Sequence, residues 1–309
     1  MRARPSQRPR AGSALAALFV VMATLGLGET AGGQTAKQLV RVALPMDMFD
    51  DVSRKDAEVA LATWAQEVLR TAKRPMEART AILDDGEAIA AATQRGELDL
   101  FGMTSLDYLR FREKLAADAA LLGDRGQGPA DEHLLIVRRD SGLAAVRDLG
   151  GKRLLLQSGT LGVLSRMWLD TLLLGQHLPE TSRFFEARAV AKPTQAVLPV
   201  FFRQADAGIV TGAAYATLQE LNPQLSRDLT ILSHSPKLTF SLFLFGKQAD
   251  TELRDLVSET AFRFPTTAMG KQVLLLFKLR RILPYNPSAL EGVSGLARDH
   301  AAQRAGRRP

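Results

Sequence analysis

Residues 134–178 of this chain read LLIVRRDSGLAAVRDLGGKRLLLQSGTLGVLSRMWLDTLLLGQHL. The pattern predicts a strand at 134–138, a turn at Ser141-Gly142 and a second strand at 153–156. That second strand ends in Gln157-Ser158-Gly159-Thr160, and a long apolar helix follows. Unbonded backbone N–H groups and the positive end of the helix dipole gather at such a helix start. The stretch therefore predicts a pocket for an anion.

The same strand-to-helix pattern continues on both sides of this stretch and predicts an α/β fold. Alternating strands and helices form parallel sheets covered by helices, and a chain of 309 residues is long enough for two lobes. Ligands of open parallel sheets lie outside the carboxyl ends of the strands. The predicted strands include 39–44, 98–103, 184–190 and 207–210, and the predicted helices include 56–72, 86–94, 193–202 and 266–279.

The residues that follow these strand ends are the candidate ligand-binding residues. Most carry a hydroxyl group at or beside a helix start, where it could donate a hydrogen bond to an oxyanion. A helix N-cap with no ligand is the alternative for each hydroxyl residue, and packing in the core is the alternative for the tyrosine. The candidates are Asp47, Thr104, Ser105, Tyr108, Ser158, Gly159, Thr160 and Thr211.

The N-terminal segment has the layout of a secretory signal peptide. Four arginines lie within the first ten residues, residues 14–28 are uncharged and mostly apolar, and Ala31-Gly32-Gly33 offers small residues for cleavage. The apolar part is short for a membrane span, although an uncleaved anchor is the alternative. No cysteine follows it, which excludes a lipid-anchored lipoprotein. We therefore expect residues 1–33 to direct export.

Charge and residue usage argue against several classes of function. Removal of residues 1–33 leaves 36 basic and 32 acidic residues, a net charge of +4, of which residues 298–309 supply +3. The high pI thus comes from the chain ends, and nucleic-acid binding is not expected. The chain has no cysteine, its four histidines lack metal-ligand spacing, and Asp47, Asp50 and Asp51 lack the glycine and glutamate of a calcium loop. No cofactor or metal is expected.

Several short segments, taken in order, resemble one known family. They are Gly96-Glu97-Leu98-Asp99-Leu100-Phe101-Gly102 with Thr104-Ser105 and Tyr108, Asp140-Ser141-Gly142 with Asp148-Leu149-Gly150-Gly151-Lys152, Ser158-Gly159-Thr160 with Trp168-Leu169-Asp170, Val200-Phe201-Phe202-Arg203-Gln204-Ala205-Asp206-Ala207, and Leu221-Asn222-Pro223-Gln224-Leu225. Over roughly residues 39–277 the chain resembles the phosphate/phosphite/phosphonate-type periplasmic substrate-binding proteins of ABC transporters, which have the type II periplasmic binding fold.

The resemblance implies two lobes, each a mainly parallel sheet flanked by helices, hinged around a central cleft. We expect lobe 1 at 34–130 plus 235–290, lobe 2 at 131–234, and a disordered basic tail at 291–309. The hinge segments are expected near 123–131 and 233–237.

The expected function is capture of a small phosphate- or phosphonate-like anion by a monomeric periplasmic protein, for an inner-membrane ABC permease or a sensor. A sensing or partner-binding protein without a transport role is the first alternative. The second is an enzyme that uses Ser158 with His133, His177 or His234 as the base. No catalytic motif in the sequence supports this second alternative, and fold alone does not fix function.

Overall fold

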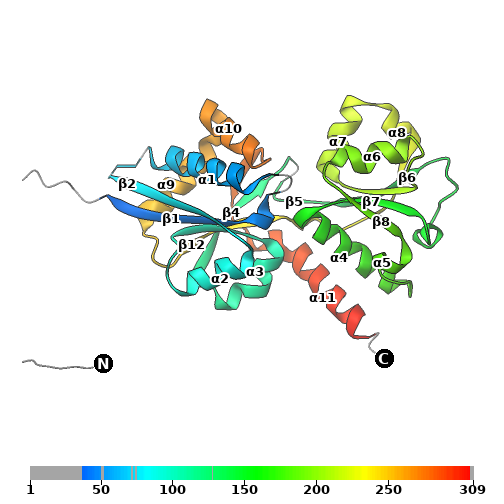
Figure 1. The fold of residues 1–309 in the computed structure, drawn as a ribbon, viewed down its shortest axis with the longest axis horizontal. Coiled ribbons are helices and arrows are strands. Elements are labelled where there is room, and N and C mark those ends of the chain that lie inside the picture. The colour runs from blue at the N-terminus through cyan, green and yellow to red at the C-terminus, as the bar shows by residue number, and fades with distance from the viewer. Residues whose placement is uncertain (1–36, 50–51, 71, 74, 127, 307–309) are drawn as a thin grey trace, which may run out of the picture. The chain divides into compact units, whose positions relative to one another are not determined.

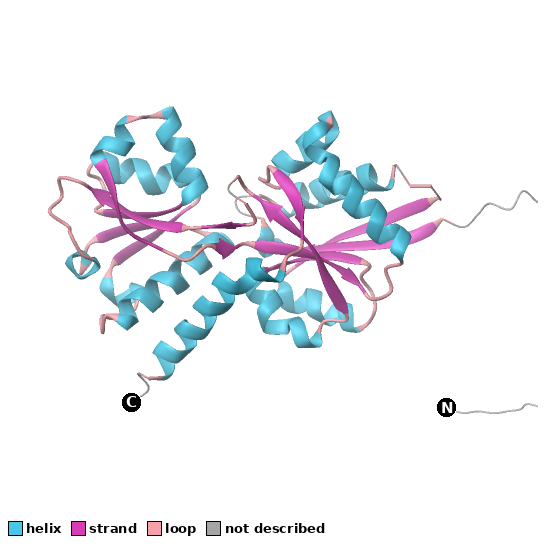
Figure 2. Ribbon diagram, turned by 180° about the vertical axis from the view of Figure 1, so that it is seen from behind, coloured by secondary structure: helices cyan, strands magenta, loops and turns pink. Residues whose placement is uncertain are grey.

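The computed structural model describes residues 37–49, 52–70, 72–73, 75–126 and 128–306. The predicted leader, together with Asp50 and Asp51, lies outside the described residues. Two sheets, each with helices on both faces, make up the fold (Figures 1 and 2). No helix in the described ranges is both long and apolar enough to cross a membrane.

The first sheet, with its helices, forms lobe 1. It has the strand order β13-β4-β12-β3-β1-β2. Its strands are β1 (Gln38–Pro45), β2 (Met76–Leu83), β3 (Leu100–Thr104), β4 (Ala117–Asp124), β12 (Ser241–Gly246) and β13 (Arg281–Pro284). Its helices are α1 (Arg54–Leu69), α2 (Gly86–Gln94), α3 (Ser105–Phe111), α9 (Thr251–Arg263) and α10 (Ala268–Leu276).

The second sheet, with its helices, forms lobe 2. It has the strand order β10-β6-β9-β7-β8. Its strands are β6 (His133–Arg138), β7 (Arg153–Gln157), β8 (Glu186–Val190), β9 (Ala207–Thr211) and β10 (Leu229–His234). Its helices are α4 (Gly159–Gly175), α5 (Thr181–Phe184), α6 (Pro193–Phe201), α7 (Gly212–Leu221) and α8 (Gln224–Asp228).

Both sheets are mixed, which corrects the expectation of mainly parallel sheets. β1 pairs in parallel with β2 and β3, and β7 pairs in parallel with β8 and β9. β12 and β6, by contrast, run antiparallel to both of their neighbours. These are the strands that follow the two passages of the chain between the lobes, so each enters its sheet from the edge at which the parallel strands end.

The two passages pair with each other as a short antiparallel ladder. β5 (Ala130–Asp131) carries the chain into lobe 2, and β11 (Leu238–Thr239) carries it back. Each lies at or close to one of the predicted hinge segments. The pairing links the passages, so a rotation of one lobe about this point must move both.

Residues 291–305 form a helix, α11 (Glu291–Ala305), in place of the expected disordered tail. Val293 and Leu296 are buried in the core of lobe 2, and α11 lies beside α4 and α3 (Figure 1). At Gly292 a Cβ atom would lie 2.0 Å from the carbonyl oxygen of Lys237, so the helix begins in backbone contact with the segment before β11. Burial of these two apolar side chains explains why the segment is ordered.

Candidate functional site

A large cleft opens where the parallel strands of lobe 2 end. Its volume is about 840 Å³, and it lies between Gln157 at the end of β7, Lys192 before α6, and Thr211 at the end of β9. Arg125, Gly126, Lys278 and Arg280 of lobe 1 complete the wall. The prediction that a ligand site lies at the carboxyl ends of the strands thus leads to this cleft.

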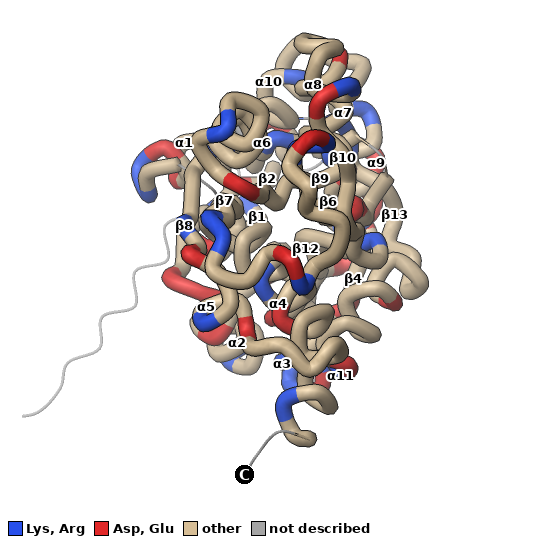
Figure 3. The backbone as a smooth tube through the Cα atoms, turned by 90° about the vertical axis from the view of Figure 1, so that its right-hand side faces the viewer, with Lys and Arg blue, Asp and Glu red and all other residues tan. Residues whose placement is uncertain are grey.

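The charged side chains of the cleft are mostly basic. Arg125, Lys192, Lys278 and Arg280 carry positive charge, and Glu220 is the one acidic residue among the described residues that line it. Elsewhere the charges are interspersed, as the tube in Figure 3 shows. Low-dielectric walls that carry one sign of charge focus the electric field, so this cleft attracts anions.

Asp124, at the end of β4, holds the lobe 1 wall in place. Its Oδ1 accepts the backbone N–H groups of Gly126 (2.6 Å) and Gly128 (2.9 Å), and its Oδ2 accepts Nε of Arg281 (2.7 Å). Its backbone oxygen accepts the N–H of Arg280 at 2.7 Å. Burial opposes ionisation of Asp124, but Arg281 and the two amides outweigh it and hold the pKa below its ordinary value.

The arginines of this wall are positioned by packing. The guanidinium of Arg125 stacks over the ring of Phe240, 4.0 Å from its centre. Gly126 has a φ of +142°, and a Cβ atom there would lie 3.2 Å from Cδ of Arg280. Glycine at 126 therefore lets the side chain of Arg280 lie against the loop.

The helices that begin around the cleft differ in whether side chains accept hydrogen bonds from their first backbone N–H groups. Asp131 Oδ2 accepts the N–H of Ala213 at 3.0 Å, and Thr211 Oγ1 accepts that of Ala214 at 3.4 Å, so the protein itself caps α7. Ser158, the N-cap of α4, makes no side-chain cap bond, and its hydroxyl lies 3.4 Å from the carbonyl oxygen of Val190. The start of α4 therefore retains more capacity to bind an anion than the start of α7.

The predicted hydroxyls of lobe 1 take part in internal hydrogen bonds. Thr104 caps α3: its Oγ1 accepts the N–H of Asp107 (3.1 Å) and donates to Oδ2 of Asp107 (2.7 Å). Ser105 is fully buried and donates to the carbonyl oxygen of Thr239 at 2.6 Å. Tyr108 is half-buried against the core on the α2 face of the first sheet. None of these three candidates lines the cleft.

Asp47 and Thr160 contact each other across the lobes. The hydroxyl of Thr160 donates to the backbone oxygen of Asp47 at 2.5 Å. Burial, together with the carboxylates of Asp107 and Asp85, raises the pKa of Asp47 to about 7. The structure thus brings these two candidates together, but outside the residues that line the cleft.

Ser158 and Gly159 line a second hollow, of about 490 Å³, beside α4 and α11. Arg166, His300 and Arg304 lie on its wall, but so do Asp170 and Glu180. Arg304 pairs with Glu180 at 3.0 Å. Because acidic residues offset the basic ones here, this hollow is a weaker anion site than the cleft.

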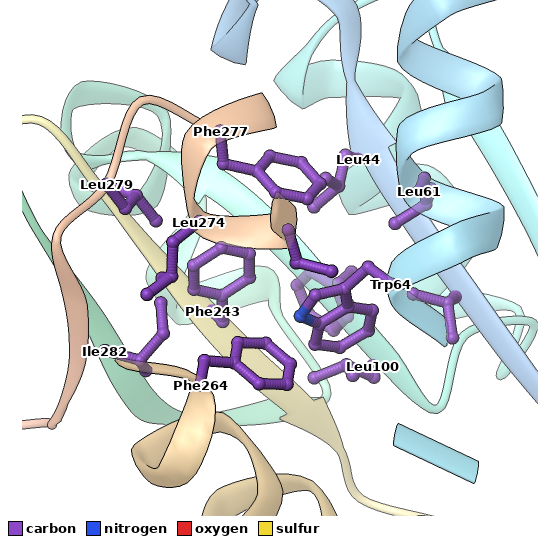
Figure 4. A pocket seen from close by; sticks show the side chains of 13 residues that line it. Leu44, Leu61, Trp64, Leu100, Phe243, Phe264, Leu274, Phe277, Leu279 and Ile282 are labelled. Carbon is purple, nitrogen blue, oxygen red and sulfur yellow. The ribbon is translucent and has the colours of Figure 1, made fainter. Parts of the chain in front are cut away.

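A third cavity lies in the core of lobe 1 and is closed to charged solutes. Its wall is apolar, with Trp64, Phe264 and Phe277 among the side chains that converge on it (Figure 4). Its volume is about 10 Å³, the size of one water molecule. An anion would lose its hydration on entering this cavity, and the apolar wall has no group that could replace the lost hydrogen bonds.

His133, one of the three bases considered for an enzyme, lies against Ser165 and not against Ser158. It is buried, and its Nδ1 lies 2.6 Å from Oγ of Ser165. Burial lowers the pKa of His133 to about 4. No group of three His, Cys, Asp or Glu residues that could hold a metal ion is found among the described residues.

Sequence reasoning missed the four basic residues of the cleft. Lys192 had a usable signal, because Lys192-Pro193 follows a predicted strand and opens a predicted helix. Lys278 and Arg280 had no such signal in the sequence. They precede β13, a strand that was not predicted from the sequence. Of the candidate residues, Thr211 alone is among those that line the cleft.

Residues 50–290 match the family described as "ABC transporter, phosphonate, periplasmic substrate-binding protein". The chain belongs to this family. The resemblance stated from the sequence is thereby confirmed, and so is a two-lobed fold of the type II periplasmic binding class. The family is one of periplasmic transporter components rather than enzymes. No curated protein sequence matches the chain.

Solved structures share the fold at low sequence identity. A protein from Xanthomonas citri bound to chloride ion has a TM-score of 0.60 and 17% identity, covering 87% of this chain and 99% of that one. A binding protein component of an ABC phosphonate transporter from Pseudomonas aeruginosa has a TM-score of 0.57 and 13% identity, covering 88% and 89%. A protein from Prochlorococcus marinus in complex with methylphosphonate has a TM-score of 0.56 and 12% identity, covering 84% and 97%.

Proposed function

We propose that this protein captures a phosphorus oxyanion in the basic cleft and presents it to an inner-membrane ABC permease. The observation that carries the proposal is the gathering of Arg125, Lys192, Lys278 and Arg280 around one cleft at the strand ends. Family membership supports the transport role. The relatives solved with chloride and with methylphosphonate support an anionic solute.

The binding groups come from both lobes. Lys192 and Arg280 provide charge-assisted hydrogen bonds, which are about twice as strong as neutral ones. The hydroxyl of Thr211 accepts the N–H of Ala214 and keeps its own proton available to donate to the solute. Ser158, Gly159 and Thr160 do not line the cleft, so in this proposal the start of α4 acts on the solute only through the dipole of that helix.

Closure around the solute uses the paired passages β5 and β11. An anion that contacts basic groups of both lobes stabilises the closed form more than the open form, so it shifts the population toward closure. The permease would read this closed surface. Thr104, Ser105 and Tyr108 act in this proposal as structural residues of lobe 1, not as contacts to the solute.

The route to the periplasm is part of the proposal. We infer that residues 1–33 are a cleaved leader, from the four arginines, the short apolar segment and the small residues that end it. The mass of the protein recovered from the periplasm tests this step. Loss of about the first 33 residues supports it, and an intact N-terminus contradicts it.

Thermal unfolding of the full chain tests the proposed function. Phosphate, phosphite, methylphosphonate, sulfonates and small carboxylates are added in turn. A ligand at 100 times its Kd adds about 2.7 kcal/mol to the free energy of unfolding, which raises the midpoint clearly. We expect a phosphorus oxyanion to do so, and we expect Lys192→Gln and Arg280→Gln to reduce the shift.

Lys55→Gln is the matched control, because Lys55 is exposed on α1 and does not line the cleft. It should leave the shift intact. The absence of a shift with every anion, or an equal loss of the shift in the control, would overturn the proposal.

A further inference from the structure

We infer that Asp131 is a positioning residue for solute binding. Its carboxylate fixes the hinge strand β5 to the start of α7, so that one wall of the cleft and the lobe 2 side of the hinge move as one body. Asp131 does not itself line the cleft and acts through the residues that do. This role deepens the proposed function and rests on it.

The two residue pairs of the β5–β11 ladder are anchored on different lobes. Ala130 pairs with Thr239, whose backbone oxygen accepts the hydroxyl of Ser105 of lobe 1 at 2.6 Å. Asp131 pairs with Leu238, which is buried in the core of lobe 2. The boundary between the lobes therefore falls between these two pairs, and Asp131 is the first residue of β5 that belongs to lobe 2.

The start of α11 crosses the same boundary. Leu290, just before this helix, belongs to the core of lobe 1, whereas Val293 belongs to the core of lobe 2. The hydroxyl of Thr239 in β11 donates to the backbone oxygen of Ala289, which keeps this crossing beside the ladder. The chain thus changes lobe at one narrow place, and a hinge rotation is confined to it.

The side chain of Asp131 joins this boundary to α7. Its Oδ2 accepts the N–H of Ala213 at 3.0 Å, and its Oδ1 accepts the N–H of Glu132 at 2.8 Å. The backbone oxygen of Glu132 accepts the N–H of Gly212 at 2.8 Å. A Cβ atom at Gly212 would lie 2.9 Å from Oδ1 of Asp131, so glycine leaves room for the carboxylate. The end of β5 is thereby docked on the start of α7.

The part of α7 that Asp131 holds is a wall of the cleft. Thr211, Ala213 and Ala214 line the cleft, and Thr211 provides the hydroxyl that donates to the solute in the proposed function. On the other side of the hinge, Asp124 fixes the loop before β5 to lobe 1. Each wall is therefore tied by one aspartate to its own side of the hinge. A solute held between the walls then sets the angle between the lobes.

Asp131→Asn tests this role, because asparagine has an NH₂ group in place of one of the two oxygens that accept backbone N–H groups. In isothermal titration of the full chain, we expect inorganic phosphate and methylphosphonate to bind this variant about tenfold more weakly, since fewer molecules have the binding-competent wall. Removal of a negative charge near an anion site would by itself tighten binding. Weaker binding therefore identifies a positioning role rather than an electrostatic one.

Gly212→Ala is a second variant, which keeps the charge of Asp131 but places a Cβ atom against its carboxylate. It should also weaken binding, and it decides the test if Asp131→Asn does not fold. Gly295→Ala is its control, because no atom lies within 4 Å of a Cβ there. Asp148→Asn is the control for the first variant: Asp148 also accepts two backbone N–H groups in lobe 2 but does not line the cleft. Both controls should bind the two probes as the wild type does.

Closure provides a readout that a merely structural cap would not change. The chain has no cysteine, so Lys55→Cys on α1 and Arg227→Cys on α8 give one exposed dye site in each lobe. Saturating phosphate should raise the energy transfer between the two dyes, and should raise it at most about half as much when Asp131→Asn is added, because binding no longer drives closure fully.

Unchanged or tighter binding of both probes by Asp131→Asn would overturn the inference and leave the proposed function standing. Full closure of that variant with saturating phosphate would overturn it as well. If the wild type binds neither phosphate nor methylphosphonate, the proposed function falls and the role of Asp131 falls with it.

Discussion

Two ionisable residues, the buried His133 and the half-buried Asp47, link the stability of the protein to pH. The pKa of the His133 imidazole is lowered to about 4, and the pKa of the Asp47 carboxyl is raised to about 7. Both shifts favour the uncharged form of the side chain in the folded protein. Burial disfavours the charged form in each case. The consequence is that a fall in pH from about 6.5 to about 4 destabilises the fold through His133, whereas a rise in pH from about 4 to about 7 destabilises it through Asp47.

His133 should lower the stability of the fold as the pH falls from about 6.5 to about 4. The unfolded chain takes up a proton near pH 6.5, while the folded chain resists until about pH 4. The loss amounts to about 3 kcal/mol and levels off at lower pH. Urea unfolding of wild type and His133→Gln measures it: the wild type should lose stability relative to the variant across this window. A constant difference would contradict the assignment, and His177→Gln is the exposed control.

Asp47→Asn should stabilise the protein increasingly as the pH rises from about 4 to about 7. In this range the unfolded wild type ionises at Asp47 while the folded form, with a raised pKa, keeps the proton, so the wild type loses stability. The gain of the variant should be small at pH 4 and constant above about pH 7.5. Thermal midpoints of the two proteins across pH check this, and a difference independent of pH would refute it.

At the scale of elements, one carboxylate organises the cleft wall and one helix completes the core of lobe 2. Asp124 joins β4 to the loop of Arg125 and to β13, through bonds to Gly126, Gly128 and Arg281. α11 packs Val293 and Leu296 beside α4. Substitution of Asp124 or of a buried residue of α11 should therefore lower the free energy of unfolding, and more so than substitution of a similar but exposed residue.

Asp124→Ala should cost about 1–3 kcal/mol of unfolding free energy, the range for buried groups that lose their hydrogen-bond acceptor, because the Arg281 side chain is 56% exposed and stays hydrated. The side chain of Asp124 is 2% exposed, and the variant leaves Arg281 and two amides without their acceptor. Asp118→Ala is the matched control: Asp118 pairs with Arg254 at 3.1 Å but is 60% exposed, so the cost should be below about 1 kcal/mol. Equal costs in urea unfolding would show that Asp124 does not organise the wall.

Leu296→Ala should lower the free energy of unfolding by about 2–5 kcal/mol, because it leaves a cavity between α11 and α4. Leu275→Ala removes the same atoms from a side chain that is 77% exposed and should change it by less than about 0.5 kcal/mol. Guanidinium unfolding compares the two variants. A small effect of Leu296→Ala would mean that α11 does not belong to the core.

The order of these elements was predictable, while part of the site was not. The strands of the 134–178 stretch and the helix from Gly86 to Gln94 follow from apolar periodicity and turn residues. α11 was missed because Val293 and Leu296 are its buried residues, too weak a pattern to outweigh an arginine-rich end. Thr104 could be a cap or a ligand residue by sequence, and its hydrogen-bond partners become visible only in the folded structure.

At the scale of the whole molecule, the topology explains why the cleft lies where it does. In both sheets, the parallel strands end at the edge of the sheet that faces the other lobe. β5 and β11 pass between the lobes at this edge. That edge therefore gathers helix starts from lobe 2 and the basic loops from lobe 1. The cleft is basic because Arg125, Lys278 and Arg280 follow or precede strands whose ends meet there.

The position of a bound heavy oxyanion tests the central claim most directly. Crystals of the protein grown with arsenate, an analogue of phosphate, would locate the anion by the anomalous signal of arsenic. The account predicts an arsenic peak in the cleft, within hydrogen-bond reach of Lys192 or Arg280 and of Thr211. A peak in the hollow at Ser158 and Gly159, or beside Thr104, or no peak at a concentration that saturates binding in solution, would contradict it.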